Sequence, residues 1–232
     1  MPIKGVKPGQ PRKDIFHETL IWDIVPGKTS LVVIDMQNSF VHKKGPAYTV
    51  GTQETVPKIN KIVEACRNQG ILVSWVRCSH RPDGLDMGYI AEYLHDLVFK
   101  DKYLLEGSWN AEFYDNLDVK DSDLIVTKKS YSAFIPGSSP LDRILRYMGK
   151  DTIIIVGIAT NVCCGTTARD ASMLGYKVIF ISDANTAFGP RTKKGFESSI
   201  LQEAELLTLR ALFAMVCTTD ELLEELNKLP KK

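Results

Sequence analysis

The sequence lacks the features of a membrane-embedded, secreted or nucleic-acid-binding protein. None of its 232 residues lies in an apolar run near the roughly 18 residues that span a bilayer, and the N-terminus lacks the apolar run of a secretion signal. Its 29 basic and 28 acidic residues leave a net charge of +1, which creates no one-signed field to attract nucleic acid or an anionic membrane. We therefore expect a cytoplasmic protein whose partners are small molecules or copies of itself.

Cysteines are few, odd in number and free of any CxxC pair. This pattern excludes a disulfide framework and a zinc knuckle, so the thiols are expected to stay reduced. The five residues are Cys66, Cys78, Cys163, Cys164 and Cys217.

Hydrophobic residues make up 44% of the chain and charged residues 25%, which suits a globular protein with a full core. Residues 1–28 are rich in proline and lysine, so we interpret them as an N-terminal arm that packs on the domain or on a neighbouring subunit. Residues 29–232 form the predicted main domain.

Short β-branched runs alternate with helical stretches from Ser30 onward, which predicts parallel strands joined by crossover helices. The runs are almost continuously apolar, so helices should cover both faces of the sheet. The predicted fold is a three-layer αβα Rossmann-like α/β fold with a six-stranded, mostly parallel sheet. Its strands are predicted at residues 31–35, 71–77, 124–128, 152–157, 177–181 and 211–216.

The spacing of apolar residues and the residues that begin or end helices support this architecture. Val56, Ile59, Val63 and Cys66 recur at helical spacing, and a further helix should run over residues 162–174. Two glycines and a proline mark the ends of these helices: Pro57 is expected in a first turn, and Gly70 and Gly175 as stops.

Two more helices are expected near the C-terminus. Pro190 can open one whose apolar face holds Phe196, Ile200, Ala204 and Leu207. The last begins with a capping box formed by Thr218 and Glu221. Residues 80–122 show no clean period, and long segments of this kind often form the walls of a binding site.

Ligands of open parallel sheets bind beyond the carboxyl ends of the strands, so polar residues there are the candidates. Asp35 and Lys128 end two of the predicted strands, and Cys163 follows a third. A thiol with a pKa of about 8.5 needs a base or a cation beside it to act as a nucleophile at neutral pH. The carboxylate and the ammonium group can supply both, and a dyad of Cys163 with His80 is the alternative.

Three segments carry a family resemblance. They read VVIDMQNSF at 32–40, VTKKSYSAF at 126–134 and VGIATNVCCGTTARDA at 156–171. In order and separation they resemble the signatures of the isochorismatase-like cysteine hydrolases, over roughly residues 29–226. The resemblance implies that Asp35 is the catalytic carboxylate, that Lys128 rather than Lys129 is the lysine, and that Cys163 rather than Cys164 is the nucleophile.

The same resemblance implies a non-proline cis peptide bond just before Ala159, with the N–H groups of Ala159 and Cys163 forming an oxyanion hole. It also implies an amidohydrolase acting on a linear amide, ureido or N-carbamoyl C–N bond through a thioester. N-carbamoylsarcosine amidases and ureidoacrylate amidohydrolases look most similar. The alternatives are a nicotinamidase, an isochorismatase, and a noncatalytic or redox protein that binds small molecules.

Side chains near the strand ends are candidates for substrate binding. They are Gln37, Phe40, His80, Arg81, Trp109, Tyr131 and Phe134. No metal and no cofactor are expected. Nicotinamidase-like metal sites use a D-x-H motif and a further histidine after the second strand. The corresponding stretch here, RCSHRPDG, has no aspartate two residues before its single histidine. The family is commonly oligomeric, so a homo-oligomer is expected, with a tetramer as one option.

Overall fold

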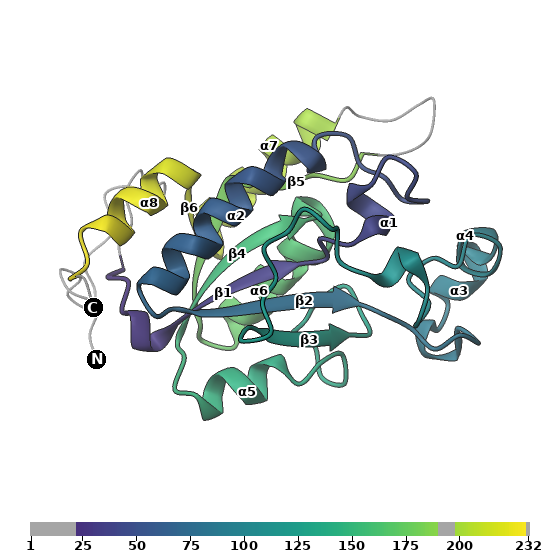
Figure 1. The fold of residues 1–232 in the computed structure, drawn as a ribbon, viewed down its shortest axis with the longest axis horizontal. Helices are drawn as coiled ribbons and strands as arrows, with labels where there is room; N and C mark the ends of the chain where they lie inside the picture. The colour runs from purple at the N-terminus through teal and green to yellow at the C-terminus, as the bar shows by residue number, and fades with distance from the viewer. Residues whose placement is uncertain (1–21, 190–197, 231–232) are drawn as a thin grey trace.

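A parallel sheet forms the centre of the computed structural model, which describes residues 22–189 and 198–230 (Figure 1). Its six strands lie in the order β3-β2-β1-β4-β5-β6, and every pairing is parallel. The strands are β1 (Thr29–Ile34), β2 (Leu72–Cys78), β3 (Leu124–Lys128), β4 (Thr152–Ile158), β5 (Lys177–Thr186) and β6 (Met215–Cys217). The predicted six-stranded α/β fold is confirmed, and the sheet is parallel throughout.

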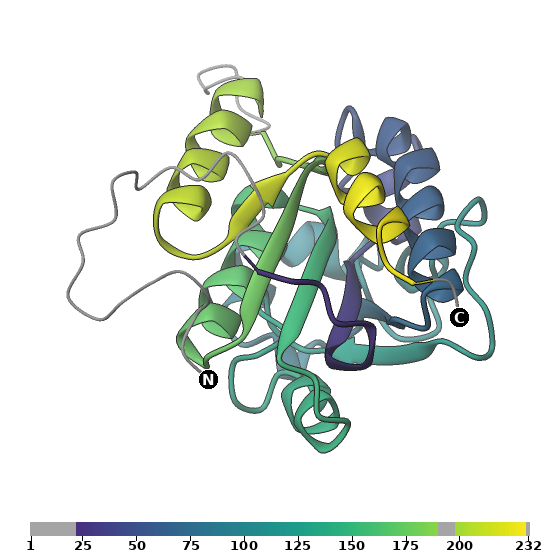
Figure 2. The same ribbon diagram turned by 90° about the vertical axis from the view of Figure 1, so that its left-hand side faces the viewer.

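Helices cover both faces of the sheet, as the continuous apolar runs predict (Figure 2). One face packs against α2 (Thr52–Asn68) and α8 (Thr219–Asn227), and the other against α5 (Leu141–Tyr147), α6 (Gly165–Met173) and α7 (Ser198–Leu212). Successive strand residues enter opposite layers: Leu31 and Val33 belong to the first core, Val32 and Ile34 to the second. The predicted three-layer architecture follows from this alternation.

One short 3-10 turn precedes β1, and the other short helical turns fill the loops that follow the strands. They are the 3-10 turns Pro26–Lys28, Leu85–Met87 and Trp109–Ala111, the helices α1 (Asn38–Val41), α3 (Ile90–Tyr93) and α4 (His95–Phe99), and a π-helical turn at Thr160–Cys164. Four of these seven turns lie between β2 and β3, in the segment that shows no clean sequence period. None of the helices in the described part of the chain is long and apolar enough to cross a membrane.

Several predicted boundaries are wrong. The sixth strand begins at Met215, because α7 continues through Leu212. Strand β5 extends to Thr186, past the predicted end at residue 181. Helix α2 begins at Thr52, which places Pro57 inside it; Pro57 is exposed, so the carbonyl group that loses its N–H partner can bond to water.

Other helix predictions fare differently. The capping box of α8 is confirmed, with the Thr218 side chain accepting from the Glu221 N–H. The predicted positions Pro190 and Phe196 lie outside the described residues. Ile200 and Leu207 share a face of α7 as predicted, but that face is exposed on the single chain and Leu209 is the buried residue.

Only part of the predicted arm can be located. Residues 1–21 lie outside the described chain. Trp22 and Ile24 pack against the core on the α2 side of the sheet, so residues 22–28 lie on the domain itself.

Gly157 lets β4 approach β1 closely just before the carboxyl ends of the two strands. Its φ is 127°, and a Cβ at this position would lie 2.1 Å from the carbonyl oxygen of Ile34. We predict that Gly157→Ala lowers the free energy of unfolding by about 1 to 3 kcal/mol more than Gly149→Ala, because Gly149 also has a positive φ but has open space around it. Urea unfolding of the two variants measures the difference, and equal losses would contradict the close approach.

Candidate active site

Strand ends bring Asp35 and Lys128 together. Asp35 follows β1 directly with a positive φ of 53°, and its N–H bonds to the carbonyl oxygen of Val76 at 2.8 Å. Lys128 is the last residue of β3 and reaches across the intervening β2. Its Nζ lies 2.9 Å from Oδ2 of Asp35, and each side chain is only 1% exposed. The result is a buried ion pair between two strands that are not neighbours.

Cys163 joins this pair from the π-helical turn that follows β4. Its Sγ lies 3.6 Å from the Nζ of Lys128, and the Asp35 carboxylate is close enough to raise the pKa of the thiol. Cys164 is fully buried in the core beside α6 and does not line the cavity. The three residues selected from the sequence therefore meet at one point, and the two adjacent thiols have different surroundings.

Burial and charge set the protonation states of this cluster. Burial opposes the charge of Lys128, yet the attraction of Asp35 and neighbouring thiols holds the pKa of Lys128 well above its ordinary value. Burial also raises the pKa of Cys163; the Lys128 ammonium opposes this rise and the Asp35 carboxylate adds to it. Lys128 therefore stays an ammonium group, and the Cys163 thiol is neutral at rest.

A proton can pass from Cys163 to Asp35 without changing the net charge of the cluster. The negative charge then moves from an oxygen 2.9 Å from Nζ to a sulfur 3.6 Å away. At an effective dielectric constant of about 20, this displacement weakens the attraction to the ammonium group by about 1 kcal/mol. Lys128 is thus placed to stabilise the charge before and after the transfer.

The turn before Cys163 has an unusual backbone. The Ile158–Ala159 peptide bond is cis, as the family resemblance implies. The carbonyl oxygen of Ala159 accepts from the N–H groups of Val162 and Cys164, both at 3.0 Å, and this fixes the turn. Ala159 and Cys163 both line the cavity, while the role of their N–H groups as an oxyanion hole stays a prediction.

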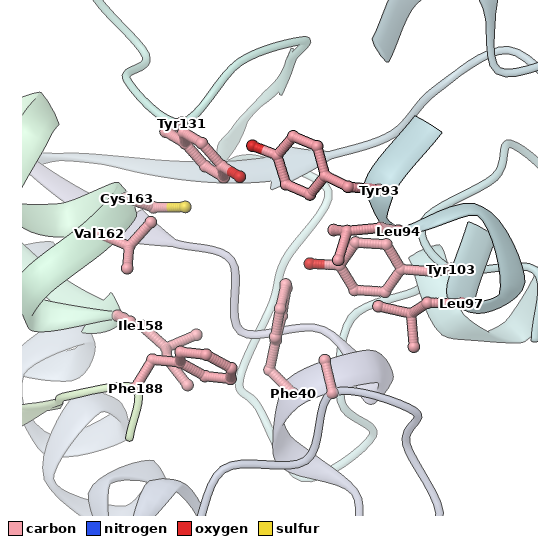
Figure 3. Close-up of a pocket in the computed structure, with 12 residues that line it drawn as sticks. Phe40, Tyr93, Leu94, Leu97, Tyr103, Tyr131, Ile158, Val162, Cys163 and Phe188 are labelled. Atoms are coloured by element: carbon pink, nitrogen blue, oxygen red, sulfur yellow. The ribbon is translucent and has the colours of Figure 1, made fainter. Parts of the chain in front are cut away.

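A cavity of about 270 Å³ opens beside the Cys163 sulfur (Figure 3). Its lining is mainly aromatic and aliphatic. The lining residues are Phe40, Ala47, Tyr93, Leu94, Leu97, Tyr103, Tyr131, Ile158, Ala159, Val162, Cys163 and Phe188. A smaller recess of about 30 Å³ adjoins it and is bordered by Asp35, Lys128 and His80. The thiol lies where the apolar cavity meets the polar recess.

His80 borders the recess but contacts other partners than Cys163. Its Nε2 lies 3.2 Å from the Sγ of Cys78, and its Nδ1 lies 3.3 Å from the carboxylate of Asp86. Burial lowers the pKa of His80 despite the Asp86 carboxylate, which favours the neutral imidazole. The Cys163 sulfur contacts the Nζ of Lys128 instead, so the alternative dyad with His80 has no support in this geometry.

Several predicted substrate contacts need correction. Phe40 and Tyr131 line the cavity, whereas Gln37, Arg81, Trp109 and Phe134 do not. Gln37 is fully buried and braces the strand ends, donating to the carbonyls of Cys78 and Ala111 and accepting from the Cys78 N–H.

The other three have different positions. Arg81 is exposed and paired with Asp83. Trp109 packs edge-on against His42 near the surface, and Phe134 packs in the core against Tyr176.

Most of the cavity wall consists of residues that the sequence does not single out. Tyr93, Leu94, Leu97 and Tyr103 come from the segment between β2 and β3, for which the sequence predicts only a role in the walls of a binding site. Phe188 follows β5. Its place after a strand was the one available signal, because strand ends of a parallel sheet share one edge.

Comparison with known proteins agrees with this geometry. The family model described as the isochorismatase domain matches residues 29–221. The chain belongs to the isochorismatase family. Ureidoacrylate amidohydrolase RutB of Klebsiella pneumoniae is 29% identical to this family member over 223 residues, which cover 87% of this chain and 88% of the relative.

Solved structures of the family show the same architecture. A cysteine hydrolase from Pseudomonas syringae pv. phaseolicola superposes with a TM-score of 0.83 at 34% identity, over 89% of this chain and 95% of the other. N-carbamoylsarcosine amidase from Thermoplasma acidophilum gives a TM-score of 0.64 at 26% identity, over 83% and 97%.

Five buried cysteines should make this isochorismatase-family chain less stable in alkali. Burial raises the pKa of Cys78 to about 11 and those of Cys66 and Cys217 to about 12, and it raises those of Cys163 and Cys164 as well. The unfolded chain ionises its thiols from about pH 8.5, so above that pH it binds fewer protons than the folded chain. The free energy of unfolding should then fall by up to about 1.4 kcal/mol per pH unit per cysteine.

Reversible urea unfolding between pH 7.5 and pH 10 under reducing conditions measures this slope. Cys66→Ala serves as the control, because it should reduce the slope by the share of one thiol. A slope that is unchanged in the variant would contradict the assignment to buried cysteines.

Proposed function

We propose that this chain is a cysteine-dependent hydrolase of a C–N bond in a linear amide, ureido or N-carbamoyl small molecule. The carrying observation is the Cys163 thiol in contact with the Lys128 ammonium group, which is itself paired with the Asp35 carboxylate, at the edge of an open cavity. Relatives named ureidoacrylate amidohydrolase and N-carbamoylsarcosine amidase support this reaction class.

Acylation begins when Asp35 takes the proton of the Cys163 thiol. The thiolate attacks the carbonyl carbon of the substrate, and the ammonium group of Lys128 stabilises the cluster as charge leaves the carboxylate. Protonation of the leaving nitrogen, with the proton returned from Asp35, releases ammonia or an amine and leaves a thioester on Cys163.

The developing oxyanion needs hydrogen-bond donors. We assign this role to the N–H groups of Ala159 and Cys163, which belong to the rigid turn at the cavity floor. Loss of one such donor typically costs about 2.7 to 4 kcal/mol of transition-state stabilisation.

Deacylation needs a water molecule on the polar side of the thioester. The recess of about 30 Å³ beside Asp35, Lys128 and His80 has room for at least one water, since a water needs roughly 10 to 15 Å³ of such space. Asp35 deprotonates this water, which attacks the thioester and restores the thiol. The product is a carboxylic acid, or a carbamate that decays to carbon dioxide and ammonia when the substrate is an N-carbamoyl compound.

The two adjacent thiols provide a matched test. Cys163→Ala should lower ammonia release from amide and ureido substrates by at least about 10⁴-fold, as expected for loss of a nucleophile. Cys164→Ala should keep most of the activity, because Cys164 faces the core. Intact-mass measurement of the wild-type protein with a turned-over substrate should show an acyl adduct on Cys163. A flat screen without an adduct would favour a noncatalytic binding protein.

The two adjacent lysines provide a second test. Lys128→Met should abolish turnover and lower the free energy of unfolding by about 3 to 5 kcal/mol, because it leaves the Asp35 carboxylate buried without a partner. Lys129→Met should cost less stability, since Lys129 is 36% exposed and its partner Asp86 is less buried than Asp35. Thermal and urea unfolding with parallel ammonia assays compare the two. Equal stability losses would argue against the ion pair as the organising interaction.

The remaining expectations stay predictions. These are a metal-free and cofactor-free reaction, a cytoplasmic location, an N-terminal arm ahead of one hydrolase domain, and assembly into a homo-oligomer. Size-exclusion chromatography with light scattering measures the last of these.

A further inference from the structure

We propose that Cys78, His80 and Asp86 form a chain of polar contacts that holds the water molecule for deacylation against the thioester on Cys163. In this chain the Cys78 thiol touches the water, and His80 and Asp86 are positioning residues behind it. The inference rests on the proposed function and adds residues to its second step. It follows from the contacts of three side chains that the acylation step does not use.

The three side chains contact one another in order. The Sγ of Cys78 lies 3.2 Å from the Nε2 of His80, within hydrogen-bonding range for sulfur. On the other side of the ring, the Nδ1 of His80 lies 3.3 Å from Oδ1 of Asp86. The imidazole ring therefore links a thiol to a carboxylate, as it does in enzymes that use a cysteine, a histidine and an orienting acid.

The thiol end of this chain lies at the recess beside the nucleophile. Cys78 and His80 both border the recess of about 30 Å³, together with Asp35, Lys128 and Cys163. Cys78 is 7% exposed and His80 is 3% exposed, so both are largely shielded from bulk water. A water molecule in the recess thus shares one small space with the Cys78 thiol and the Asp35 carboxylate.

The surroundings of Asp86 keep this carboxyl group charged. Burial opposes the charge, but Oδ2 lies 2.9 Å from the Nζ of Lys129, and Oδ1 accepts from the N–H of Arg81 at 3.0 Å. The pKa of Asp86 is accordingly held below its ordinary value. A carboxylate beside Nδ1 of His80 favours the tautomer with the proton on that nitrogen. Nε2 is then an acceptor for the proton of the Cys78 thiol.

The imidazole and the thiol are both neutral at rest. Burial lowers the pKa of His80 despite the Asp86 carboxylate, and burial raises the pKa of Cys78 to about 11. The S–H group of Cys78 therefore donates to Nε2 of His80 at neutral pH. What the sulfur offers to a water molecule is a lone pair, which accepts a weak hydrogen bond.

Backbone hydrogen bonds fix both residues in place. The N–H of His80 donates to the carbonyl oxygen of Leu104, and its carbonyl oxygen accepts from the N–H of Glu106, both at 2.8 Å. Cys78 is the last residue of β2, and its N–H and carbonyl groups both bond to the side chain of Gln37. Groups that are held in this way orient a bound molecule at little further cost in entropy.

Two acceptors orient the water better than one, because a single hydrogen bond leaves it free to rotate. The water donates one hydrogen to the Asp35 carboxylate and the other to the Cys78 sulfur, and its lone pair then faces the carbonyl carbon of the thioester. Asp35 takes the proton as the new C–O bond forms. The C–S bond then breaks, and the Cys163 sulfur receives that proton from Asp35. Cys78, His80 and Asp86 keep their own protons throughout.

The activated ester p-nitrophenyl acetate separates the two steps. Attack by Cys163 releases p-nitrophenolate in a burst and leaves an acetyl group on the sulfur, and hydrolysis of this thioester then limits the steady-state rate. We expect Cys78→Ala to lower the steady-state rate by at least about 10-fold and to keep the burst rate within about twofold of the wild-type value, because only deacylation uses the water. Intact-mass measurement should show acetyl enzyme accumulating in this variant.

Three further variants serve as comparisons. Cys78→Ser should recover most of the lost rate, since a hydroxyl group also donates to Nε2 and accepts from water. Asp86→Asn should slow the steady state and spare the burst, because it removes the charge that fixes the tautomer of His80. Cys217→Ala is the matched control: Cys217 is also 7% exposed but lies at β6, and its loss should leave both phases unchanged.

Hydroxylamine distinguishes a missing water contact from a distorted site. It attacks the thioester directly, which forms a hydroxamic acid and frees the Cys163 thiol without the water. Added hydroxylamine should therefore restore the turnover of Cys78→Ala toward that of the wild-type enzyme. A variant that is impaired because its site is distorted would show a weaker burst, and hydroxylamine would not restore it.

The outcomes separate the two hypotheses. No acetyl group on Cys163, in the wild-type enzyme or in Cys78→Ala, would contradict the proposed function and the inference with it. Acetylation of Cys163 with an unchanged steady-state rate in Cys78→Ala would overturn the inference alone. Equal losses of burst and steady-state rate in that variant would also overturn it, and so would an acetyl group on Cys78 of the wild-type enzyme.

Discussion

The buried ion pair of Asp35 and Lys128 is the interaction on which the rest of the site depends. Taking both groups out of water costs several kcal/mol each, and a buried pair of this kind often contributes little net stability. The pair matters for the reaction because its ammonium group lies 2.9 Å from a carboxylate oxygen and 3.6 Å from the sulfur of a thiol. Removal of either partner would leave the other charged and unsolvated, so carboxylate and ammonium group depend on each other.

The sheet positions this pair through its strand order. Because β2 lies between β1 and β3, the side chains of Asp35 and Lys128 meet only beyond the carboxyl ends of the strands. The left-handed backbone at Asp35 turns its carboxylate toward the pair, and Gly157 lets β4 approach β1 so that the turn with Cys163 lies alongside. These local constraints act through the packing of both helical layers.

The sequence predicts the reacting groups but not the wall around them, for a physical reason. Asp35 and Lys128 end strands that are readable as apolar runs, Cys163 follows another, and the carboxyl ends of parallel strands share one edge of the sheet. The segment between β2 and β3 has no such local signal. Its short helices are placed by tertiary contacts, such as the hydrogen bond from the His80 N–H to the Leu104 carbonyl and the edge-on packing of Tyr103 against Phe40. Such contacts join residues far apart in the chain, which periodicity does not detect.

The apolar wall of the cavity changes the strength of the electrostatic interactions in the charged cluster. Hydrocarbon around the thiol lowers the local dielectric constant, which strengthens the attraction of Lys128 for whichever neighbour carries the negative charge. Part of this hydrocarbon lies directly beside the reacting sulfur, because Ile158 and Val162 line the cavity together with Cys163. A change to this part of the wall should therefore alter the reactivity of the thiol as well as the fit of the substrate.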